Sequence, residues 1–134
     1  MPLPNNEPEV VRVLHDYYTA FSTLEVEAVL PYFHEPALLI GPQGAFAATT
    51  HALVATAVAP TMEGFRDRGF GRTELSVRSV KSLSATAALV TGVAQRYKDA
   101  GQELDRAGVT NVLYRADAGW KIAVLVVHDP EEAR

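Results

Sequence analysis

From Thr73 to His128 the chain reads TELSVRSVKSLSATAALVTGVAQRYKDAGQELDRAGVTNVLYRADAGWKIAVLVVH, and apolar and polar residues alternate along much of it. Such alternation is typical of β-strands, because successive side chains of a strand point to opposite faces of the sheet. Residues that favour turns interrupt the pattern at three places: 84–85, 99–102 and 117–119. The stretch therefore predicts four long strands that tight turns join into an antiparallel meander: 73–83, 86–98, 103–116 and 119–128.

The residues that precede this stretch follow a helical period instead. Apolar side chains recur every three or four positions from Val10 to Phe21, behind a capping-box start formed by Asn6 and Glu9. This pattern predicts an amphipathic first helix with one face on a core.

A second, short helix is expected to follow the first. Ser22 and Glu25 repeat the capping-box spacing, and apolar residues again recur at helical intervals after them. Pro31 lies inside this pattern and lacks the amide hydrogen that a helix interior needs. We therefore expect the second helix to kink or to end near Leu30.

A small hairpin and a third helix complete the first half of the chain. Residues 36–44 form an apolar run that Gly-Pro and Gly interrupt, which predicts a strand and a turn, with 45–48 as the returning strand. The third helix follows, with Thr49 or Thr50 as its N-cap. Pro60 predicts a break or kink in it.

Length and composition indicate one domain. The 134 residues are 48% hydrophobic and 21% charged, which suits a single domain over 1–134 with one core. Helices followed by a long meander predict an α+β fold. Strands of this length must twist, so we expect the sheet to curl around the helices and bury its concave face against them.

The sequence also argues against several functional classes. It has no cysteine, no zinc-type histidine spacing and no phosphate-binding glycine loop, so we expect no metal and no cofactor. A net charge of −4 argues against nucleic acid as a partner. No apolar run approaches the roughly 20 residues that span a bilayer, and the first residues do not resemble a signal peptide. We therefore expect a cytoplasmic protein without a membrane partner.

Asn111 is the polar residue of greatest interest, because it interrupts an otherwise apolar strand and would need a ligand, a water or another partner if buried. If it faces the helices, alternation sends Asp105 and Val109 to the same face. Strand pairing then places Arg96 opposite Asp105. The last strand adds its alternate residues to that face: Trp120, Ile122, Val124, Val126 and His128. Three small residues there would leave space for a ligand: Gly92, Ala94 and Ala107.

The order of elements resembles that of the nuclear transport factor 2-like superfamily. Two stretches carry most of the likeness, 16–44 and 109–128, and both are similar to parts of SnoaL-like and ketosteroid isomerase-like members. The resemblance implies a cone-shaped, curved antiparallel sheet wrapped around three N-terminal helices, which is a cystatin-like α+β roll. It also implies a cavity between the sheet and the helices that accepts a small molecule.

The resemblance assigns expected roles to three positions. In ketosteroid isomerases a tyrosine and a carboxylic acid bind the developing oxyanion, and an aspartate moves the proton. The tyrosine falls on Tyr17, the acid on Asn111 and the aspartate on Gly41. An amide can still donate a hydrogen bond, but glycine cannot act as a base. The chain therefore lacks the usual catalytic aspartates, and steroid isomerisation by the family route is not expected.

A base must then come from elsewhere on the concave face. His128 oriented by Asp105 would serve, with Tyr17 and Asn111 holding the negative charge. The expected ligand-binding residues are Arg96, Val109, Trp120, Val124, Val126 and Gly41. Each polar residue also has a structural interpretation: Tyr17 as a core residue, Arg96 and Asp105 as an exposed ion pair, and His128 as a solvated strand end.

Two functions fit these observations. The first is a cofactor-free enzyme that performs acid–base chemistry on a small, largely apolar substrate, as a cyclase, isomerase, lyase or hydrolase. Epoxide hydrolases of the superfamily use two aspartates and an arginine, and here a second inward aspartate is missing. The second is a non-catalytic ligand-binding or dimerisation module of the same fold.

A homodimer is expected in either case. The face opposite Asn111 is largely apolar, and soluble monomers rarely expose such a surface. Its expected residues are Leu89, Thr91, Val93, Thr110, Val112, Tyr114, Ala123, Leu125 and Val127.

Overall fold

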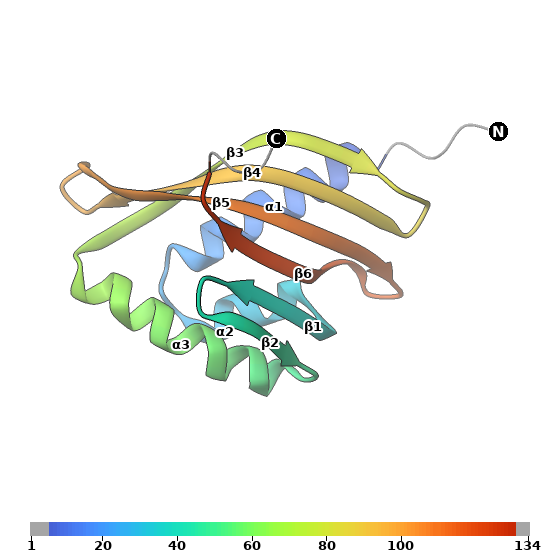
Figure 1. Ribbon diagram of the computed structural model, residues 1–134, viewed down its shortest axis with the longest axis horizontal. Helices are drawn as coiled ribbons and strands as arrows, with labels where there is room; N and C mark the ends of the chain where they lie inside the picture. Colours follow the sequence, from blue (N-terminus) through green and yellow to red (C-terminus); the bar gives the residue numbers. More distant parts are fainter. Residues whose placement is uncertain (1–5, 131–134) are drawn as a thin grey trace.

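The computed structural model describes residues 6–130 and shows an α+β fold (Figure 1). Its helical elements are α1 (Glu7–Phe21), α2 (Val26–Val29), the 3-10 turn η1 (Leu30–Tyr32) and α3 (His51–Asp67). Its strands are β1 (Phe33–Gly41), β2 (Gly44–Ala48), β3 (Phe70–Ser82), β4 (Ala87–Lys98), β5 (Glu103–Ala116) and β6 (Gly119–His128). The predicted meander is confirmed, and the bounds of its last two strands are those expected from the sequence.

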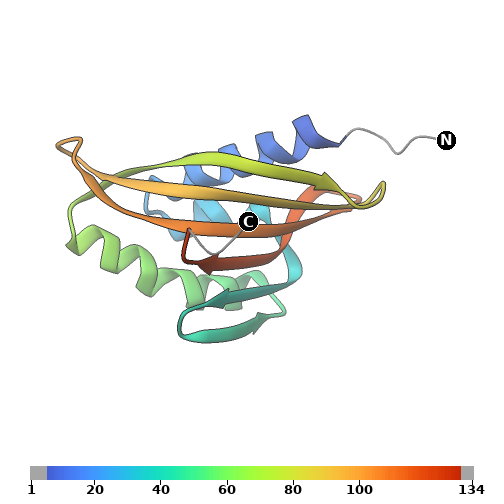
Figure 2. The ribbon, with the colours of Figure 1, turned by 45° about the horizontal axis from the view of Figure 1, so that its top comes forward.

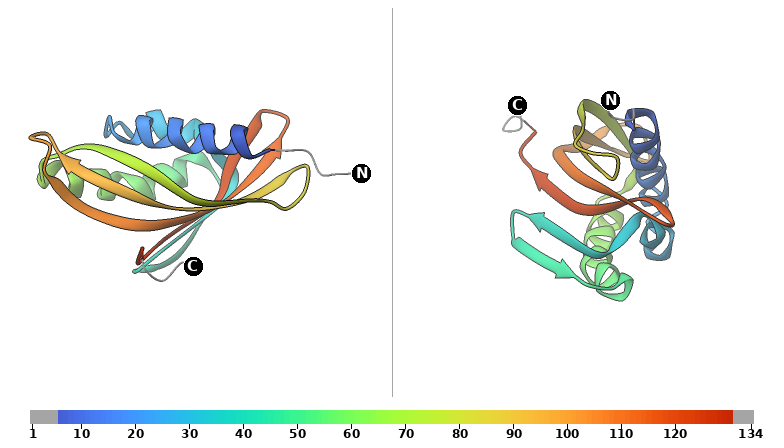
Figure 3. Two further views of the ribbon diagram at one scale, coloured as in Figure 1. Left: turned by 90° about the horizontal axis from the view of Figure 1, so that it is seen from above. Right: turned by 90° about the vertical axis from the view of Figure 1, so that its right-hand side faces the viewer.

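The strands form one open, curved sheet in the order β2-β1-β6-β5-β4-β3. All neighbouring pairs are antiparallel except β1 and β6, which run parallel. Figures 2 and 3 show the long strands bending around the helices, with α1 against one face and the β1–β2 hairpin extending the sheet beside α3. The expected curved sheet around N-terminal helices is therefore confirmed.

The starts of the helices are only partly those predicted. Thr50 caps α3, and its side chain accepts a hydrogen bond from the Leu53 amide. Asn6 is the N-cap of α1, but its side chain donates to Ser82 Oγ and Ser84 O instead of closing a capping box. It ties the start of α1 to the β3–β4 turn. Glu25, not the predicted Ser22, is the N-cap of α2.

The two helix-interior prolines behave differently. The second helix ends at Val29 and tightens into η1 around Pro31, as expected. The third helix continues through Pro60, so the predicted break there is wrong. Pro60 is exposed, while the opposite face of α3 buries four side chains: Val54, Val58, Met62 and Phe65. Burial of a side chain of this size contributes about 1.5–3 kcal/mol, so the four together offset the roughly 3 kcal/mol that an interior proline costs. Among the described helices, none is long and apolar enough to cross a membrane.

A bulge in β6 changes which of its residues face the helices. Val112 pairs with Val124, but the next residue of β5, Leu113, pairs with Ile122, so Ala123 is an extra residue in β6. One extra residue reverses the alternation beyond it. Trp120 and Ile122 face the core as predicted. The prediction is wrong after Ala123, because Leu125 and Val127 turn to the concave face and three residues turn to the convex face: Val124, Val126 and His128.

Gly92 does not leave space for a ligand, contrary to expectation. A Cβ atom on Gly92 would lie 2.6 Å from the carbonyl oxygen of Ser76 and 3.2 Å from Leu75 Cδ1. Strand β3 therefore occupies the space above Gly92, next to an irregularity between Val77 and Ser79. The glycine permits close packing of β3 on β4.

Candidate functional site

A cavity of about 210 Å³ lies between the concave face of the sheet, α1 and α3. Most of the side chains around it are apolar. They come from α1, α3 and the four inner strands of the sheet: Phe21, Leu39, Ile40, Ala57, Val58, Phe65, Ala94, Val109, Leu125 and Val127. Gly41 also borders the cavity, and a Cβ atom there would have no neighbour within 4 Å. An apolar wall of this kind with a few polar groups is the usual form of a small-molecule site.

The polar groups of the cavity are Tyr17 and Tyr18 from α1, Thr61 from α3, Thr73 from β3 and Arg96 from β4. Each can donate a hydrogen bond. None of the cavity residues within 6–130 is an aspartate, a glutamate or a histidine. The site is therefore rich in donors and lacks a strong proton acceptor.

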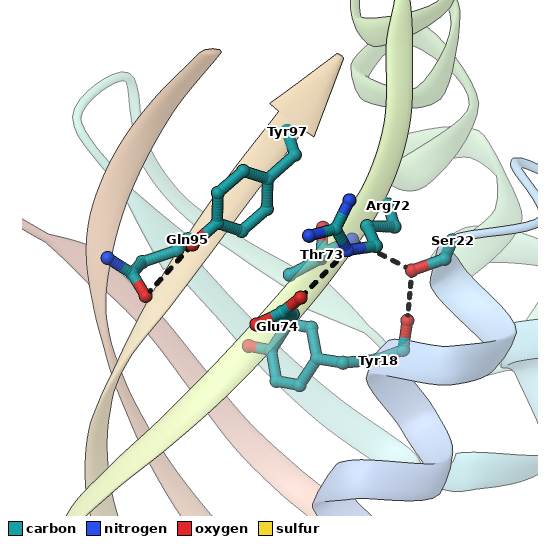
Figure 4. Close-up of polar contacts among 7 residues, drawn as sticks. All are labelled: Tyr18, Ser22, Arg72, Thr73, Glu74, Gln95 and Tyr97. Carbon is teal, nitrogen blue, oxygen red and sulfur yellow. Dashed lines mark hydrogen bonds and ion pairs between the residues drawn. The ribbon is translucent and has the colours of Figure 1, made fainter. Parts of the chain in front are cut away.

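Ser22 fixes two of these groups relative to each other. Its hydroxyl donates to the carbonyl oxygen of Tyr18 (2.8 Å) and accepts a hydrogen bond from the amide of Thr73 (2.9 Å) (Figure 4). The last turn of α1 is thus joined to β3 beside the cavity. Because both bonds involve backbone atoms, the side chains of Tyr18 and Thr73 remain available to the cavity.

The two tyrosines stay protonated over a wide pH range. Burial raises the pKa of Tyr17 well above its usual value, and the Tyr18 hydroxyl raises it further. Burial also raises the pKa of Tyr18, while Arg96 and Asn111 lower it by smaller amounts. Both phenols therefore act as hydrogen-bond donors, not as bases.

Asn111 is buried with 1% of its surface exposed. It lies close enough to Tyr18 to influence the pKa of that phenol, yet neither its Oδ1 nor its Nδ2 makes a hydrogen bond of acceptable geometry within residues 6–130. It is not itself part of the cavity wall. The amide therefore lies beside Tyr18 and outside the cavity wall, with its polar atoms poorly satisfied.

Arg96 lies at one border of the cavity in a compact charged cluster. Its Nε is 3.2 Å from Asp105 Oδ1, and the other oxygen of Asp105 is 3.1 Å from Arg68 Nη2. The Arg96 guanidinium also lies over the ring of Phe65, 4.8 Å from its centroid. Burial lowers the pKa of Arg96, and Asp105 opposes that shift.

Several residues predicted from the sequence do meet at this cavity. Tyr17, Gly41, Arg96 and Val109 border it, and Arg96 is paired with Asp105 across β4 and β5 as expected. Among the three small residues expected to leave space, only Ala94 borders the cavity. The interpretation of Arg96 and Asp105 as an ordinary exposed ion pair does not hold for Arg96, whose side chain is 16% exposed.

Other predicted residues lie elsewhere. Trp120 is buried next to the β5–β6 turn and borders a separate groove that includes Glu9 and Arg12. Val124 and Val126 face the convex side because of the bulge at Ala123, so their prediction as ligand-binding residues is wrong.

The predicted pairing of His128 with Asp105 is also wrong. His128 pairs with Gly108 on β5, and its Nε2 is 2.8 Å from Thr110 Oγ1 on the convex face. Asp105 is on the opposite face. The histidine therefore cannot reach a substrate in the cavity, and the proposed general base is lost.

Sequence reasoning missed the second tyrosine and the contribution of α3. Tyr18 follows Tyr17 on α1, and the two rings contact each other edge to face at 4.8 Å. Both are buried because the apolar face of α1 is wide enough to include adjacent positions. Phe65 lies on the apolar face predicted for the third helix, but its entry into the site, like that of Thr61, depends on how α3 packs over the sheet. Within residues 6–130, no group of three or more metal-binding side chains occurs.

Helices packed into the concave face of a curved sheet, with a small cavity between them, define the NTF2-like class of α+β proteins. The family model described as NTF2-like protein (DUF6841) matches residues 6–130, and the chain belongs to this family. No curated protein sequence matches the chain.

Solved structures support the same fold at low identity. A protein of unknown function with a cystatin-like fold from Nostoc punctiforme superposes with a TM-score of 0.74 at 13% identity, over 96% of this chain and 94% of that chain. A ketosteroid isomerase-like protein from Erwinia carotovora atroseptica gives 0.70 at 19% identity, over 92% and 95%. An NTF2-like superfamily protein from Salmonella enterica gives 0.70 at 16% identity, over 92% and 89%.

Proposed function

We propose that this protein binds a small, largely apolar molecule in the cavity between α1, α3 and the sheet, and that it does so without catalysing a reaction. The cavity itself carries the proposal: about 210 Å³ of space is bordered mainly by apolar side chains, with hydrogen-bond donors at a few points. A dry apolar cavity of about 150 Å³ in another protein binds benzene. This cavity has room for a ring and a short substituent.

The distribution of acids and bases favours binding over catalysis. The position of the family's aspartate is Gly41, and His128 is on the far side of the sheet. Asp105 does not border the cavity, and its two carboxylate oxygens are engaged in ion pairs with Arg68 and Arg96. General acid–base catalysis needs a proton acceptor within hydrogen-bonding reach of the substrate.

A neutral probe tests the binding function. We expect 3-phenylpropan-1-ol to shift the amide signals of Leu39, Gly41 and Val109 in a two-dimensional NMR titration. Gly41→Leu should abolish these shifts, because the new side chain would enter the cavity where a Cβ atom meets nothing within 4 Å. Gly64→Leu is the matched control: Gly64 lies on the exposed side of α3, and its Cβ position is also free. Shifts that persist in Gly41→Leu, or that never occur in the parent, would contradict the proposal.

A second candidate function is a ketosteroid isomerase-like or SnoaL-like enzyme that acts on a small carbonyl compound. Two phenols at the cavity that remain protonated favour it, because they can donate hydrogen bonds to a developing oxyanion. Deuterium exchange at the α-carbon of cyclohexanone, followed by NMR, separates the two functions. The binding function predicts no acceleration by the protein. An acceleration that Tyr18→Phe removes would establish the enzyme instead.

We also propose that two copies associate through the convex face of the sheet. Tyr114 is 42% exposed there, beside a shallow, mainly apolar groove bordered by His34, Pro36, Ala37, Leu38, Ala47, Ala87, Val112 and Ala123. Leu125 and Val127 do not belong to this surface, since they border the cavity. A second copy would remove the groove from water.

A further inference from the structure

The border of the cavity at Arg96 has an unusual charge arrangement. Arg96 and Arg68 share the single carboxylate of Asp105, so one positive charge has no partner in this cluster. The charged side chains that shift the pKa of Arg96 are Asp105, which raises it, and Arg68, which lowers it. Arg68 is about half exposed, at 49%, and water screens its charge, whereas the Arg96 side chain is 16% exposed. The uncompensated charge therefore acts mainly at Arg96, beside the cavity.

The guanidinium of Arg96 still has hydrogen-bonding capacity. Asp105 contacts it through Nε, and no residue within 6–130 accepts a hydrogen bond from its two terminal nitrogens. Stacking on the ring of Phe65 fixes the plane of the group. A planar guanidinium with free terminal nitrogens suits a carboxylate, which it can bind through two parallel hydrogen bonds.

Thr73 provides an independent sign of a polar ligand at the same place. It is paired with Arg96 across β3 and β4 and is 8% exposed, and it borders the cavity. Its Oγ1 is buried and has no hydrogen-bond partner within the described residues. A buried hydroxyl without a partner is costly, by about 1–3 kcal/mol, unless a ligand or water satisfies it.

We propose that the ligand is a small monocarboxylate with an apolar body. Its carboxylate would lie against Arg96 and Thr73, and its body would occupy the apolar part of the cavity near Val109 and Val127. A single uncompensated charge suits a monoanion better than a dianion such as a phosphate monoester. This inference rests on the proposed binding function, and it specifies the chemical class of the ligand.

Three probes with one apolar body and different head groups test the inference by calorimetry at low salt. They are 3-phenylpropanoate, its neutral amide 3-phenylpropanamide and the cation 3-phenylpropylamine. We expect the acid to bind the parent about tenfold or more tightly than the amide, as is usual for a charge-assisted hydrogen bond in a partly buried site. The amine should bind most weakly.

Single substitutions test which side chains cause the tighter binding of the acid than of the amide. Arg96→Gln should remove the advantage of the acid over the amide. Thr73→Val, which keeps the shape of the side chain, should reduce it several-fold. Asp105→Asn should increase it, because the carboxylate that competes for Arg96 loses its charge. Arg106→Gln is the control: Arg106 also lies on the sheet, but its side chain is 53% exposed and paired with Glu103. Thermal unfolding of each variant shows that it is folded, and Thr73→Val and Asp105→Asn test the inference even if Arg96→Gln does not fold.

The possible results separate this inference from the binding function. Equal affinities of the acid and the amide for the parent would overturn the monocarboxylate inference and leave the binding function intact. An acid preference that survives in both Arg96→Gln and Thr73→Val would also overturn it. If none of the three probes binds the parent, and 3-phenylpropan-1-ol does not bind either, the binding function fails and this inference fails with it.

Discussion

The ring of His128 packs directly on the backbone of Gly108, in space that a β-carbon on residue 108 would occupy. His128 Nδ1 is 2.8 Å from the carbonyl oxygen of Asp129, which can only accept, so Nδ1 carries the hydrogen. In the neutral ring Nε2 then accepts from the Thr110 hydroxyl at 2.8 Å. The histidine is thus held on the convex face by a bond at each nitrogen.

This packing predicts that Gly108→Ala destabilises the protein. The added methyl group would displace the ring, and overpacking of this kind costs about 1–3 kcal/mol. His128→Ala removes the nearest obstruction and leaves the Asp129 carbonyl oxygen at 3.0 Å from the new Cβ atom, so the double variant should recover part of the stability that Gly108→Ala loses. Urea unfolding of the four proteins gives the coupling energy. Additive effects would show that the two residues do not meet. None of these changes should alter binding of 3-phenylpropan-1-ol in the cavity.

The sequence predicted the faces of some strands correctly and those of others incorrectly, for a physical reason. Counting residues across the turn at 99–102 predicted the pairing of Arg96 with Asp105 correctly, although the ladder is irregular between Arg96 and Tyr97 beside that turn. The bounds of β6 were also predictable. The bulge at Ala123 was not, because it has no glycine or proline to mark it, and it reversed the faces of Val124 through His128.

Much of the cavity depends on contacts between segments distant in sequence. The parallel pairing of β1 with β6 brings Leu39 and Gly41 to the cavity, and the meander pattern gives no sign of it. The contributions of Thr61 and Phe65 depend on how α3 crosses the sheet. Local periodicity predicts which face of an element is apolar, but not which element covers it.

The orphaned amide of Asn111 leads to a prediction about stability. Both polar atoms of its side chain are buried and lack a well-formed hydrogen bond within residues 6–130, so its removal forfeits at most the loose contact with Tyr18. We expect Asn111→Leu to leave the free energy of unfolding unchanged or to increase it by about 1 kcal/mol. The affinity for 3-phenylpropan-1-ol should fall, because Tyr18 would lose the polar group that lies next to its hydroxyl. Denaturant unfolding measures the first effect and calorimetry the second. A loss of more than about 2 kcal/mol would indicate that Asn111 is needed for folding.

The proposed dimer predicts a different response at two exposed apolar residues. Light scattering coupled to size-exclusion chromatography should give the mass of a dimer at micromolar concentration. Tyr114→Lys should produce a monomer, because it places a charge in the middle of the convex-face contact. Leu53→Lys is the control, since Leu53 is 36% exposed but lies on α3 and does not border the convex-face groove. A parent protein with the mass of a monomer would refute the dimer.

Tyr17 and Tyr18 predict loss of stability at alkaline pH. Burial raises the pKa of each above the value of about 10 expected in the unfolded chain, so above that pH the unfolded state loses protons that the folded state keeps. The free energy of unfolding is therefore undiminished by these groups below pH 10 and falls as the pH rises from there. The slope is about 1.4 kcal/mol per pH unit for each tyrosine while the folded form stays protonated.

Urea unfolding between pH 8.5 and pH 11 measures this slope. The variant with Tyr17→Phe and Tyr18→Phe provides the comparison, because it retains every other titrating group and both aromatic rings. The free energy of unfolding of this variant should fall less steeply with rising pH than that of the parent. Near pH 8.5 the two proteins should show the same pH dependence. Parallel curves for the two proteins would mean that the phenols ionise in the folded state as readily as in water. The cavity would then be wetter than its apolar wall implies, and the tyrosines could not be counted as persistent donors toward a bound carboxylate or carbonyl.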